Sequence, residues 1–539
     1  MTFTSTRGLS AVDSLSAVRQ GLAPDGGLFV PTTLPQGLDL SGIQTLADAE
    51  RLVLGAFFDD VDNAVREKAV TNLLAKFPAN DPIPLVAADG FQILELFHGP
   101  TGAFKDVALS VLPVLMVAAA QSNNRTIEHS DIRTFEQSNN PNNRTIEQSK
   151  VLILTATSGD TGSAAMAGFA YVPGIEIAVF FPNTGTSRIQ RLQMTTPAAK
   201  NVHGIAIRGN FDDAQAAVKR IFADAAIRAQ AAEKGVWLSS ANSINIGRLV
   251  PQVGYYLLAA AKLAQSPNRP IEQSAQSNNP NNLNNRTIEQ SEQSAQSNNP
   301  NNRTIEQSEQ FDVVVPSGNF GNILAAYYAK QLGAPIRSFI CASNVNNVLT
   351  RFIQTGTYDP GETFTVTNSP SMDIRKSSNV ERLLWLLNGG LTGSAEAACA
   401  ETKRLMDEFA ATGRYTLNAE AKARLQADFS AAFVTPEETE AEMRLVQDRC
   451  GYVLDPHTAV ATAVARKLGY PKAGRPCVVA ATATPYKFPE TCQRAFGRDV
   501  LTNPPPSFAA LESAPITQTQ VVDINGIDAT VTALFGTAN

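Results

Sequence analysis

The sequence has few of the side chains that bind metals or form disulfides. Its 539 residues include five cysteines and four histidines, and no two cysteines form a C-x-x-C pair. A zinc site or a disulfide framework needs such residues at close, regular spacing. We therefore expect no metal and no disulfides, as is typical of a protein of the reducing cytoplasm.

Excess charge and long hydrophobic runs are also missing. The chain has 44 Lys and Arg against 50 Asp and Glu, a net charge of −6, so composition does not support a nucleic-acid partner. The longest apolar stretch, 107–120, is too short to span a membrane and contains Pro113. The N-terminal residues lack the apolar segment of a signal peptide. We expect no membrane partner.

Polar repeats are what the sequence has in excess. The octapeptide NNRTIEQS occurs at 142–149, 284–291 and 301–308, and the variant NNRTIEHS at 123–130. The copies fall in two blocks, 121–149 and 265–310, which bury too little apolar surface to offset the entropy of ordering. Each block follows a helix-like segment and precedes a strand-like one. We expect two disordered surface loops; the alternative is an Asn/Gln-rich interaction tract.

Outside these blocks, short apolar runs alternate with helical patterns. The runs are VLILTAT, EIAVFF, VHGIAI, FDVVVP, RSFICA and PCVVAAT, and the segments between them include DDAQAAVKRIFADAAIRAQAAEK and GNILAAYYAKQLG. Apolar strands that alternate with helices predict parallel sheets covered on both faces. Ligands of such sheets bind beyond the carboxyl ends of the strands. The loops that follow strands are therefore the candidate sites.

Two of these loops have the composition of an anion site. Residues 157–162 follow the first run and residues 317–322 follow the fourth, and each loop combines Gly with small hydroxyl or amide residues before a helix. Backbone N–H groups and the positive end of a helix can hold a carboxylate or a phosphate there. Neither loop is a Walker A motif or G-x-G-x-x-G, so nucleotide binding loses its main support.

One lysine stands upstream in a similar setting. Lys105, in HGPTGAFKD, follows a Gly/Pro-rich loop and precedes the apolar segment 107–120. Burial at this junction would lower its pKa, and a neutral amine can form a Schiff base. Most lysines at helix starts are simply exposed, so spacing alone leaves both interpretations open.

Together these motifs resemble the threonine synthase family. HGPTGAFKD, TSGDTG, ANSINIGRL, PSGNFGN, NSPSMDI and ATATPYKF occur in that order, and GLAPDGGLFVP resembles the opening of the family. The resemblance implies an α/β pyridoxal-phosphate enzyme of fold type II, with two open, mainly parallel sheets covered by helices. The expected domains are an N-terminal subdomain at 1–95, a small domain at 96–205, a large domain at 206–500 and a C-terminal extension at 501–539.

The resemblance also implies roles for particular residues. Lys105 would bind the cofactor, pyridoxal 5'-phosphate, and move protons at the substrate Cα and Cβ, and Thr482 would hydrogen-bond the pyridine nitrogen. The cofactor phosphate would be held by Gly318, Asn319, Phe320, Gly321 and Asn322. The substrate α-carboxylate would be held by Ser158, Gly159, Asp160, Thr161 and Gly162. The substrate phosphate would be held by Asn242, Ser243, Asn245 and Arg248, with Ser187 and Arg188 as further candidates.

Two positions depart from the family pattern. Many members have a basic residue near Gly185, so one phosphate contact is either missing here or replaced by Arg188. Members often have His where this chain has Thr484, a change that leaves Thr482 in place. The segment Asp455-Pro456-His457 predicts a helix N-cap with Pro in the first turn.

The reaction implied by the resemblance converts O-phospho-L-homoserine and water to L-threonine and phosphate. We separately expect a cytoplasmic protein, from its cysteine usage, and a monomer or homodimer. Another fold type II lyase, such as a serine/threonine dehydratase or a cysteine synthase, would share Lys105 but has no need of a phosphate group near Arg248. A nicotinamide dehydrogenase would need the glycine fingerprint that is missing here. A non-enzymatic scaffold organised by the repeats is the alternative outside the enzymes.

Overall fold

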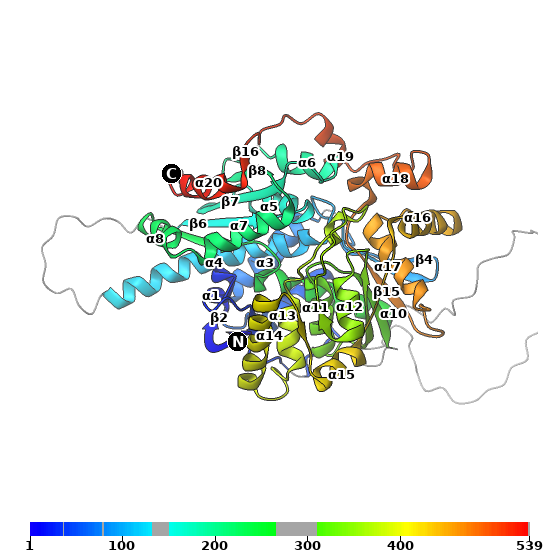
Figure 1. Ribbon diagram of the computed structural model, residues 1–539, viewed down its shortest axis with the longest axis horizontal. Coiled ribbons are helices and arrows are strands. Elements are labelled where there is room, and N and C mark those ends of the chain that lie inside the picture. Colours follow the sequence, from blue (N-terminus) through cyan, green and yellow to red (C-terminus); the bar gives the residue numbers. More distant parts are fainter. Residues whose placement is uncertain (36, 78–79, 132–149, 266–309, 537–539) are drawn as a thin grey trace, which may run out of the picture.

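The computed structural model describes residues 1–131, 150–265 and 310–536 apart from 36 and 78–79, with the backbone alone at 123–131 and 212. In this part of the chain, two sheets of mainly parallel strands lie in separate halves of the molecule, one above the other in Figure 1. Helices surround both sheets, so the α/β class expected from the sequence is confirmed.

The smaller sheet lies in the upper half of Figure 1. Its five strands are β6 (Lys150–Ala156), β7 (Ile175–Pro182), β8 (Val202–Arg208), β9 (Val236–Ser240) and β16 (Val521–Asp523). They are parallel and follow the order β16-β8-β7-β6-β9. The helices of this half are α5 (Asp160–Phe169), α6 (Arg188–Thr195), α7 (Phe211–Ala223), α8 (Ala225–Glu233) and α20 (Ile527–Leu534). Strand β7 is almost wholly buried and apolar because helices cover both faces.

The larger sheet has six strands, β4 (Leu85–Ala88), β5 (Phe91–Glu95), β10 (Phe311–Pro316), β11 (Ile336–Ser343), β14 (Phe429–Phe433) and β15 (Cys477–Ala481). Their order is β14-β11-β10-β15-β5-β4, and only β4 at the edge runs antiparallel to its neighbour. The helices of this half include α10 (Pro251–Gln265), α11 (Gly321–Gln331), α12 (Val348–Thr355), α15 (Ala419–Asp428), α16 (Pro436–Cys450) and α17 (Pro456–Lys467).

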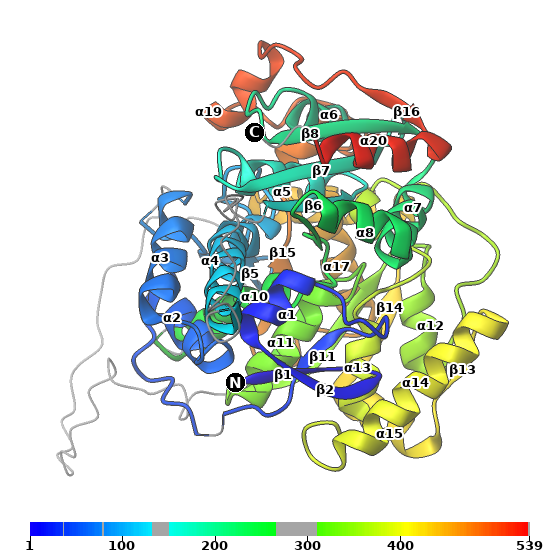
Figure 2. The same cartoon turned by 90° about the vertical axis from the view of Figure 1, so that its left-hand side faces the viewer.

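The N-terminal region packs beside the larger sheet (Figure 2). It contributes the antiparallel strands β1 (Thr2–Ser5), β2 (Gly8–Asp13) and β3 (Phe29–Pro31) and the helices α1 (Ser14–Gln20), α2 (Leu46–Phe57) and α3 (Asn63–Ala75). The other α-helices and strands of the described residues are α4 (Lys105–Asp131), α9 (Ile246–Leu249), β12 (Thr357–Tyr358), α13 (Val380–Leu387), α14 (Ala395–Thr412), β13 (Tyr415–Thr416), α18 (Pro489–Phe496) and α19 (Pro506–Ala509).

Helix α4 is the apolar helix of the protein core. By length and composition its segment Lys105–Ser122 is apolar enough to cross a membrane, but 61% of that segment is buried inside the protein. The helix packs against α1, α3, α5 and α9, and Figure 2 shows α3 and α4 side by side. Its burial against other helices accounts for its apolar composition.

The structure confirms the six strands expected from the apolar runs. The helical segment after β8 is two helices, because Asp224 ends α7 and caps α8. The strands β4 and β5 join the larger sheet and β16 joins the smaller one, while the expected division into domains stays a prediction. The expectation of disorder from residue 121 was wrong at its start, because α4 continues to Asp131.

The two repeat blocks do connect a helix to a strand. The first lies between α4 and β6 and the second between α10 and β10. Most of each block falls outside the described residues, so its expected disorder stays a prediction. The start of the first block is helical because extending an existing helix orders only one more residue for each hydrogen bond that is gained.

Candidate active site

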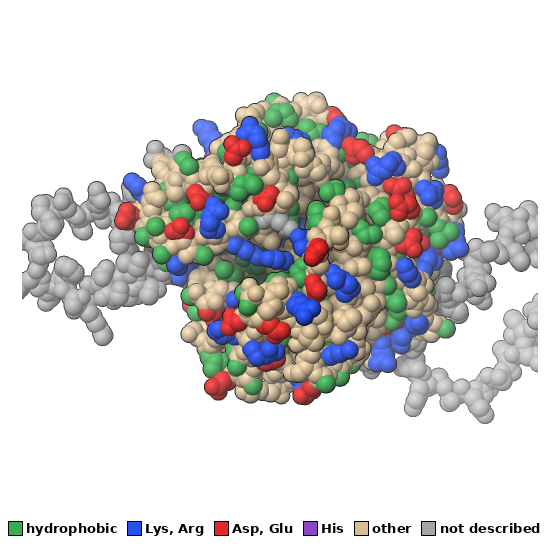
Figure 3. Space-filling model, in the orientation of Figure 1, with side chains coloured by type: hydrophobic (Ala, Val, Ile, Leu, Met, Phe, Trp, Pro, Cys, Tyr) green, Lys and Arg blue, Asp and Glu red, His purple; other side chains and the backbone are tan. Residues whose placement is uncertain are grey.

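A cavity lies between the two sheets, beyond the carboxyl ends of β6, β10 and β15. The surface is hollowed between the upper and lower halves of the molecule, with Lys and Arg side chains beside the hollow (Figure 3). The predicted site residues that line the cavity are Lys105, Ser158, Asp160, Thr161, Asn242, Ser243, Arg248, Gly318, Asn319, Phe320, Gly321, Asn322 and Thr482. Residues from distant parts of the sequence therefore meet where parallel sheets bind ligands.

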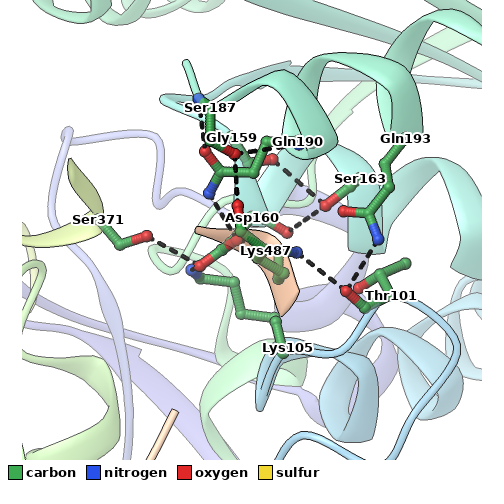
Figure 4. A network of polar contacts seen from close by, with 12 residues as sticks. Thr101, Lys105, Gly159, Asp160, Ser163, Ser187, Gln190, Gln193, Ser371 and Lys487 are labelled. Carbon is green, nitrogen blue, oxygen red and sulfur yellow. Dashed lines mark hydrogen bonds and ion pairs between the residues drawn. The ribbon is translucent and has the colours of Figure 1, made fainter. Parts of the chain in front are cut away.

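Lys105 is the first residue of α4, and its side chain points into the cavity beside Asp160 (Figure 4). Its Nζ lies 3.4 Å from Asp160 Oδ2, and the side chain is 11% exposed. Burial lowers the pKa of Lys105 to about 8; the negative charge of Asp160 opposes this fall, and the positive charges of Arg248 and Lys487 add to it. A substantial fraction of the side chain is therefore neutral near pH 8, as a nucleophilic amine requires.

Asp160 is the centre of a buried polar network (Figure 4). Its Oδ1 accepts a hydrogen bond of 2.7 Å from Gln190 Nε2 and forms an ion pair with Lys487 Nζ at 2.9 Å. Its Oδ2 accepts from Ser371 Oγ at 2.8 Å. Burial alone would raise the pKa of Asp160, but Lys487 and Lys105 hold it well below its usual value. The carboxylate is therefore ionised and surrounded by donors.

His457 connects this network to the larger sheet. It lies at the start of α17, where Asp455 caps the helix and Pro456 follows, which confirms the predicted N-cap. Its Nδ1 lies 2.8 Å from Asp455 Oδ1, and its Nε2 accepts from the backbone N–H of Ser371 at 3.1 Å. Because Nε2 accepts, the proton of a neutral ring is on Nδ1, facing Asp455.

The glycine loop after β10 presents a polar wall to the cavity. Phe320 has a left-handed backbone (φ 61) and caps α11 with no side-chain hydrogen bond, so the first N–H groups of that helix are open to a ligand. A Cβ at Gly318 would lie 2.8 Å from the carbonyl oxygen of Ser371, so only glycine fits there. Asn322 Oδ1 accepts from Tyr255 and Tyr256, while its buried Nδ2 has no partner among the described residues.

Arg248 is a buried cation in the wall of this cavity. It lies on α9, is 2% exposed, and its Nη1 donates to the carbonyl oxygen of Ala241 at 2.7 Å. Its Nε is buried without a hydrogen-bond partner, and within the described ranges no carboxylate pairs with it. Burial lowers the pKa of Arg248 to about 10. A buried guanidinium with unused donors is what a site for a phosphate or another anion requires.

The neighbours of Arg248 in ANSINIGRL differ in their surroundings. Asn242 lines the cavity, but its side chain pairs with both the N–H and the carbonyl oxygen of Ala156 at the end of β6. Ser243 lines the cavity as well. Asn245 is fully buried, caps α9 and donates to the carbonyl oxygens of Val18 and Ser240, so its contacts hold the backbone.

Hydrogen bonds between residues of the loop 157–162 fix its conformation. Thr157 Oγ1 accepts from the N–H groups of Gly159 and Gly162, each at 2.9 Å. Gly159 has φ 150, and a Cβ there would lie 2.5 Å from the side chain of Gln190. The loop residues whose atoms line the cavity are Thr157, Ser158, Asp160 and Thr161.

The structure does not bring Ser187 and Arg188 to this cavity. They line a separate surface pocket, together with Gly185. Arg188 is half-exposed and pairs with Glu512 at 2.5 Å, while Ser187 Oγ donates to the carbonyl oxygen of Lys487. Gly185 faces open space at φ 95, so the departure at this position leaves the buried cavity unchanged.

Three functional candidates were missed from the sequence, namely Lys487, Gln190 and Ser371. Lys487 and Ser371 lie in motifs that carried the resemblance, ATATPYKF and NSPSMDI. The signal that could have found Lys487 is Asp160 itself, because a carboxylate in an anion-binding loop needs a cation beside it. No group of His, Cys, Asp and Glu that could hold a metal occurs among the residues described.

Two mainly parallel sheets with a buried lysine, an open helix N-terminus and an unpartnered amide around one cavity are the arrangement expected of a pyridoxal-phosphate enzyme of fold type II. Two family profiles match the chain, "Threonine synthase N terminus" over residues 2–51 and "Threonine synthase, C-terminal" over residues 458–531.

Individual relatives agree with these profiles. The threonine synthase of Pseudomonas aeruginosa is 34% identical over 92% of this chain and 90% of that protein. The threonine synthase of Schizosaccharomyces pombe is 33% identical over 85% of this chain and 82% of its own length. The chain thus belongs to the threonine synthase family of pyridoxal-phosphate-dependent lyases.

Solved structures show the same fold. The PLP-bound threonine synthase of Brucella melitensis superposes with a TM-score of 0.78 at 31% identity and covers 99% of both chains. The threonine synthase of yeast superposes with a TM-score of 0.79 at 27% identity, covering 98% of both chains. These likenesses confirm the fold expected from the sequence.

Proposed function

We propose that this protein converts O-phospho-L-homoserine and water to L-threonine and phosphate, with pyridoxal 5'-phosphate as its cofactor. One observation carries the proposal: a lysine of lowered pKa and an arginine with unused hydrogen-bond donors line the same buried cavity. The lysine suits cofactor attachment and proton transfer, and the arginine suits a phosphate-bearing substrate.

The residues around the cavity fit the cofactor. Lys105 would hold its aldehyde carbon, and the N–H groups at the start of α11, with Asn322 Nδ2, would hold its phosphate. Gly318, Asn319, Phe320 and Gly321 form the rest of this wall. Thr482 would face the pyridine nitrogen with a neutral hydroxyl. When bound, the cofactor withdraws electrons from the substrate and stabilises the negative charge left at Cα after proton removal.

The substrate α-carboxylate would lie against the loop 157–162. Ser158 and Thr161 reach the cavity there, and the loop opens helix α5. Asp160 would serve differently from Ser158 and Thr161, since an ionised carboxylate repels another carboxylate. Its position beside Lys105 suits the amino groups that exchange at the cofactor.

The substrate phosphate would bind to Arg248. Its buried guanidinium offers Nε and further N–H donors, and Ser243 lies in the same wall. Phosphate binding would satisfy those donors and offset the cost of burying the charge. The same contacts would stabilise the negative charge that grows on the phosphate as its bond to Cγ breaks.

Lys105 would carry the protons. As a free amine it accepts a proton from Cα, and its place at the start of α4 lets one flexible side chain serve both Cα and Cβ. Once phosphate has left Cγ, the proton taken from Cβ would go to Cγ and complete the methyl group. The hydroxyl of water would then add at Cβ, and Lys105 would return a proton to Cα. The bond from Ser371 Oγ to Asp160 crosses from the larger half to the smaller, which suits a site that closes to exclude stray water.

Two measurements test this function. Borohydride reduction of the protein loaded with pyridoxal phosphate is expected to label the peptide that contains Lys105; a label elsewhere contradicts its role. Incubation with O-phospho-L-homoserine is expected to release phosphate and L-threonine in equal amounts. A serine/threonine dehydratase would instead form 2-oxo acids from L-serine or L-threonine without phosphate release.

We propose further that the enzyme acts in the cytoplasm as a monomer or homodimer. The scarcity of cysteine supports a reducing compartment, and the described cysteines are all free thiols. Size-exclusion chromatography with light scattering measures the assembly, and a larger oligomer contradicts this assignment.

A further inference from the structure

A second lysine, Lys487, is buried more deeply than Lys105. It ends the turn Pro485–Lys487 that follows β15 and is 0% exposed. Its Nζ donates to the carbonyl oxygen of Thr101 at 2.9 Å and pairs with Asp160 Oδ1 at 2.9 Å. Burying an ammonium is costly unless it is paired and hydrogen-bonded, and both conditions are met here.

Asp160 lies between the two lysines but does not pair with them equally. The contact with Lys487 is 2.9 Å, whereas the contact with Lys105 is 3.4 Å. Figure 4 shows Asp160 with Lys487 on one side and Lys105 on the other. Because one carboxylate balances a single positive charge, the shorter pair leaves Lys105 less fully compensated.

The groups around Lys105 come from several elements. Asp160 lies on α5, Arg248 on α9 and Lys487 in the turn after β15, while His457 of α17 lines the same cavity. Among the residues that the structure describes, Asp160 is the one whose negative charge acts on Lys105, and the positive charges of Arg248 and Lys487 oppose its effect. Without Lys487, the Asp160 carboxylate would have Lys105 as its nearest cation.

We propose that Lys487 is a positioning residue of the active site, which holds the Asp160 carboxylate in an ion pair and so keeps Lys105 available as a free amine. Asp160 in turn fixes the direction of the Lys105 side chain without neutralising it. The inference rests on the proposed role of Lys105 in binding the cofactor. It differs from a purely structural role for Lys487, which would affect folding but not the protonation of Lys105.

The test measures the protonation of Lys105 directly. The full-length protein, freed of pyridoxal phosphate, is labelled with trace acetic anhydride across a pH series, and mass spectrometry gives the acetylated fraction of the Lys105 peptide. Lys487→Met removes the charge but leaves donors on both its partners, because Gln190 donates to Asp160 and Gln193 donates to Thr101. The matched control is Lys330→Met, which breaks the ion pair of Lys330 with Asp428 outside the cavity.

The two partners are expected to shift the labelling curve in opposite directions. Lys487→Met should raise the pH of half-labelling at Lys105 by roughly one unit, because Asp160 then pairs with Lys105. Asp160→Asn should lower it, because only like charges remain. If Asp160→Asn does not fold, the double variant Lys487→Met with Asp160→Asn removes both members of the buried ion pair, and its curve should lie below that of Lys487→Met. Lys330→Met should leave the curve in place.

An unchanged Lys105 curve in Lys487→Met, or a shift in the same direction in both single variants, would overturn the inference. Failure of the proposed function looks different, because the unaltered protein would then release no phosphate from O-phospho-L-homoserine whatever the labelling curves show. In the loaded enzyme, where the bound substrate frees the Lys105 amine, Lys487→Met should also move the acidic limb of the pH profile of kcat upward, and Lys330→Met should not.

Discussion

The buried guanidinium of Arg248 is expected to lower the stability of the folded protein and to favour anion binding. Burial lowers the pKa of Arg248 to about 10, against an ordinary value of roughly 12.5. At about 1.4 kcal/mol per pH unit, this difference means that the folded protein pays about 3 kcal/mol for the charge. Arg248→Met keeps the volume of the side chain but removes the charge and one hydrogen bond to Ala241, which contributes about 1 kcal/mol.

We therefore expect Arg248→Met to stabilise the protein by about 2 kcal/mol when no anion is bound. Binding of inorganic phosphate to Arg248 should stabilise the folded protein. At a hundredfold excess over its Kd, a ligand stabilises the folded state by roughly 2.7 kcal/mol, and the variant should lose this gain. The assay is urea unfolding of the protein loaded with pyridoxal phosphate, with and without inorganic phosphate, so that the cofactor fills its own phosphate site.

Arg382 supplies the matched control. It is also fully buried with a pKa lowered to about 10, but it donates to the backbone oxygens of Phe29 and Ile244 and to Asn379. Arg382→Met should therefore destabilise the protein and leave the response to phosphate intact. The reasoning is refuted if Arg248→Met destabilises the protein as Arg382→Met does, or if it keeps the full stabilisation by phosphate.

Three further predictions concern other parts of the chain. Lys105→Ala should abolish phosphate release from O-phospho-L-homoserine, and a near-normal rate would contradict its role in proton transfer. Glu50 is fully buried, its pKa is raised well above the usual value by burial, and neither carboxyl oxygen has a partner among the described residues. Because the pKa of Glu50 is raised in the folded protein, the free energy of unfolding is highest below the pKa that Glu50 has in the unfolded chain and falls as the pH rises. In urea unfolding, Glu50→Gln should therefore gain stability over the parent protein from pH 5 to pH 8. A gain that does not grow with pH refutes this. Replacing 132–149 and 266–309 by short Gly-Ser linkers should keep kcat within about twofold, because these polar repeats contain none of the motifs of the candidate site and closure entropy changes slowly with loop length. A large loss of kcat in a folded protein would give the repeats a role in catalysis.

Local patterns in the sequence predicted the elements that carry most of the cavity. The apolar runs of β6, β10 and β15 are buried on both faces, and the loops that follow them line the cavity. The motifs identified Lys105 and Arg248 as candidate site residues, and the structure adds that both side chains are buried. Their roles stay predictions until the measurements above are made.

The remaining features depend on contacts between distant segments. Arg188 was a reasonable phosphate ligand by chemistry, but it pairs with Glu512 from a C-terminal segment that no local pattern could place. The same holds for β16, a short exposed strand that adds to the smaller sheet beside β8. The pairing of Lys487 with Asp160 is a third case, because a buried ion pair is visible only once its two segments are folded together.

The central claim, that the cavity removes phosphate from Cγ and adds water at Cβ, is tested most directly by running the reaction on O-phospho-L-homoserine in water enriched in heavy oxygen. Elimination breaks the bond between carbon and oxygen, so phosphate leaves with all its original oxygen and the hydroxyl of threonine comes from the solvent. The account predicts equal amounts of L-threonine and phosphate, with the heavy isotope in threonine alone. Heavy oxygen in the released phosphate, with homoserine as the product, would show hydrolysis at phosphorus and contradict it.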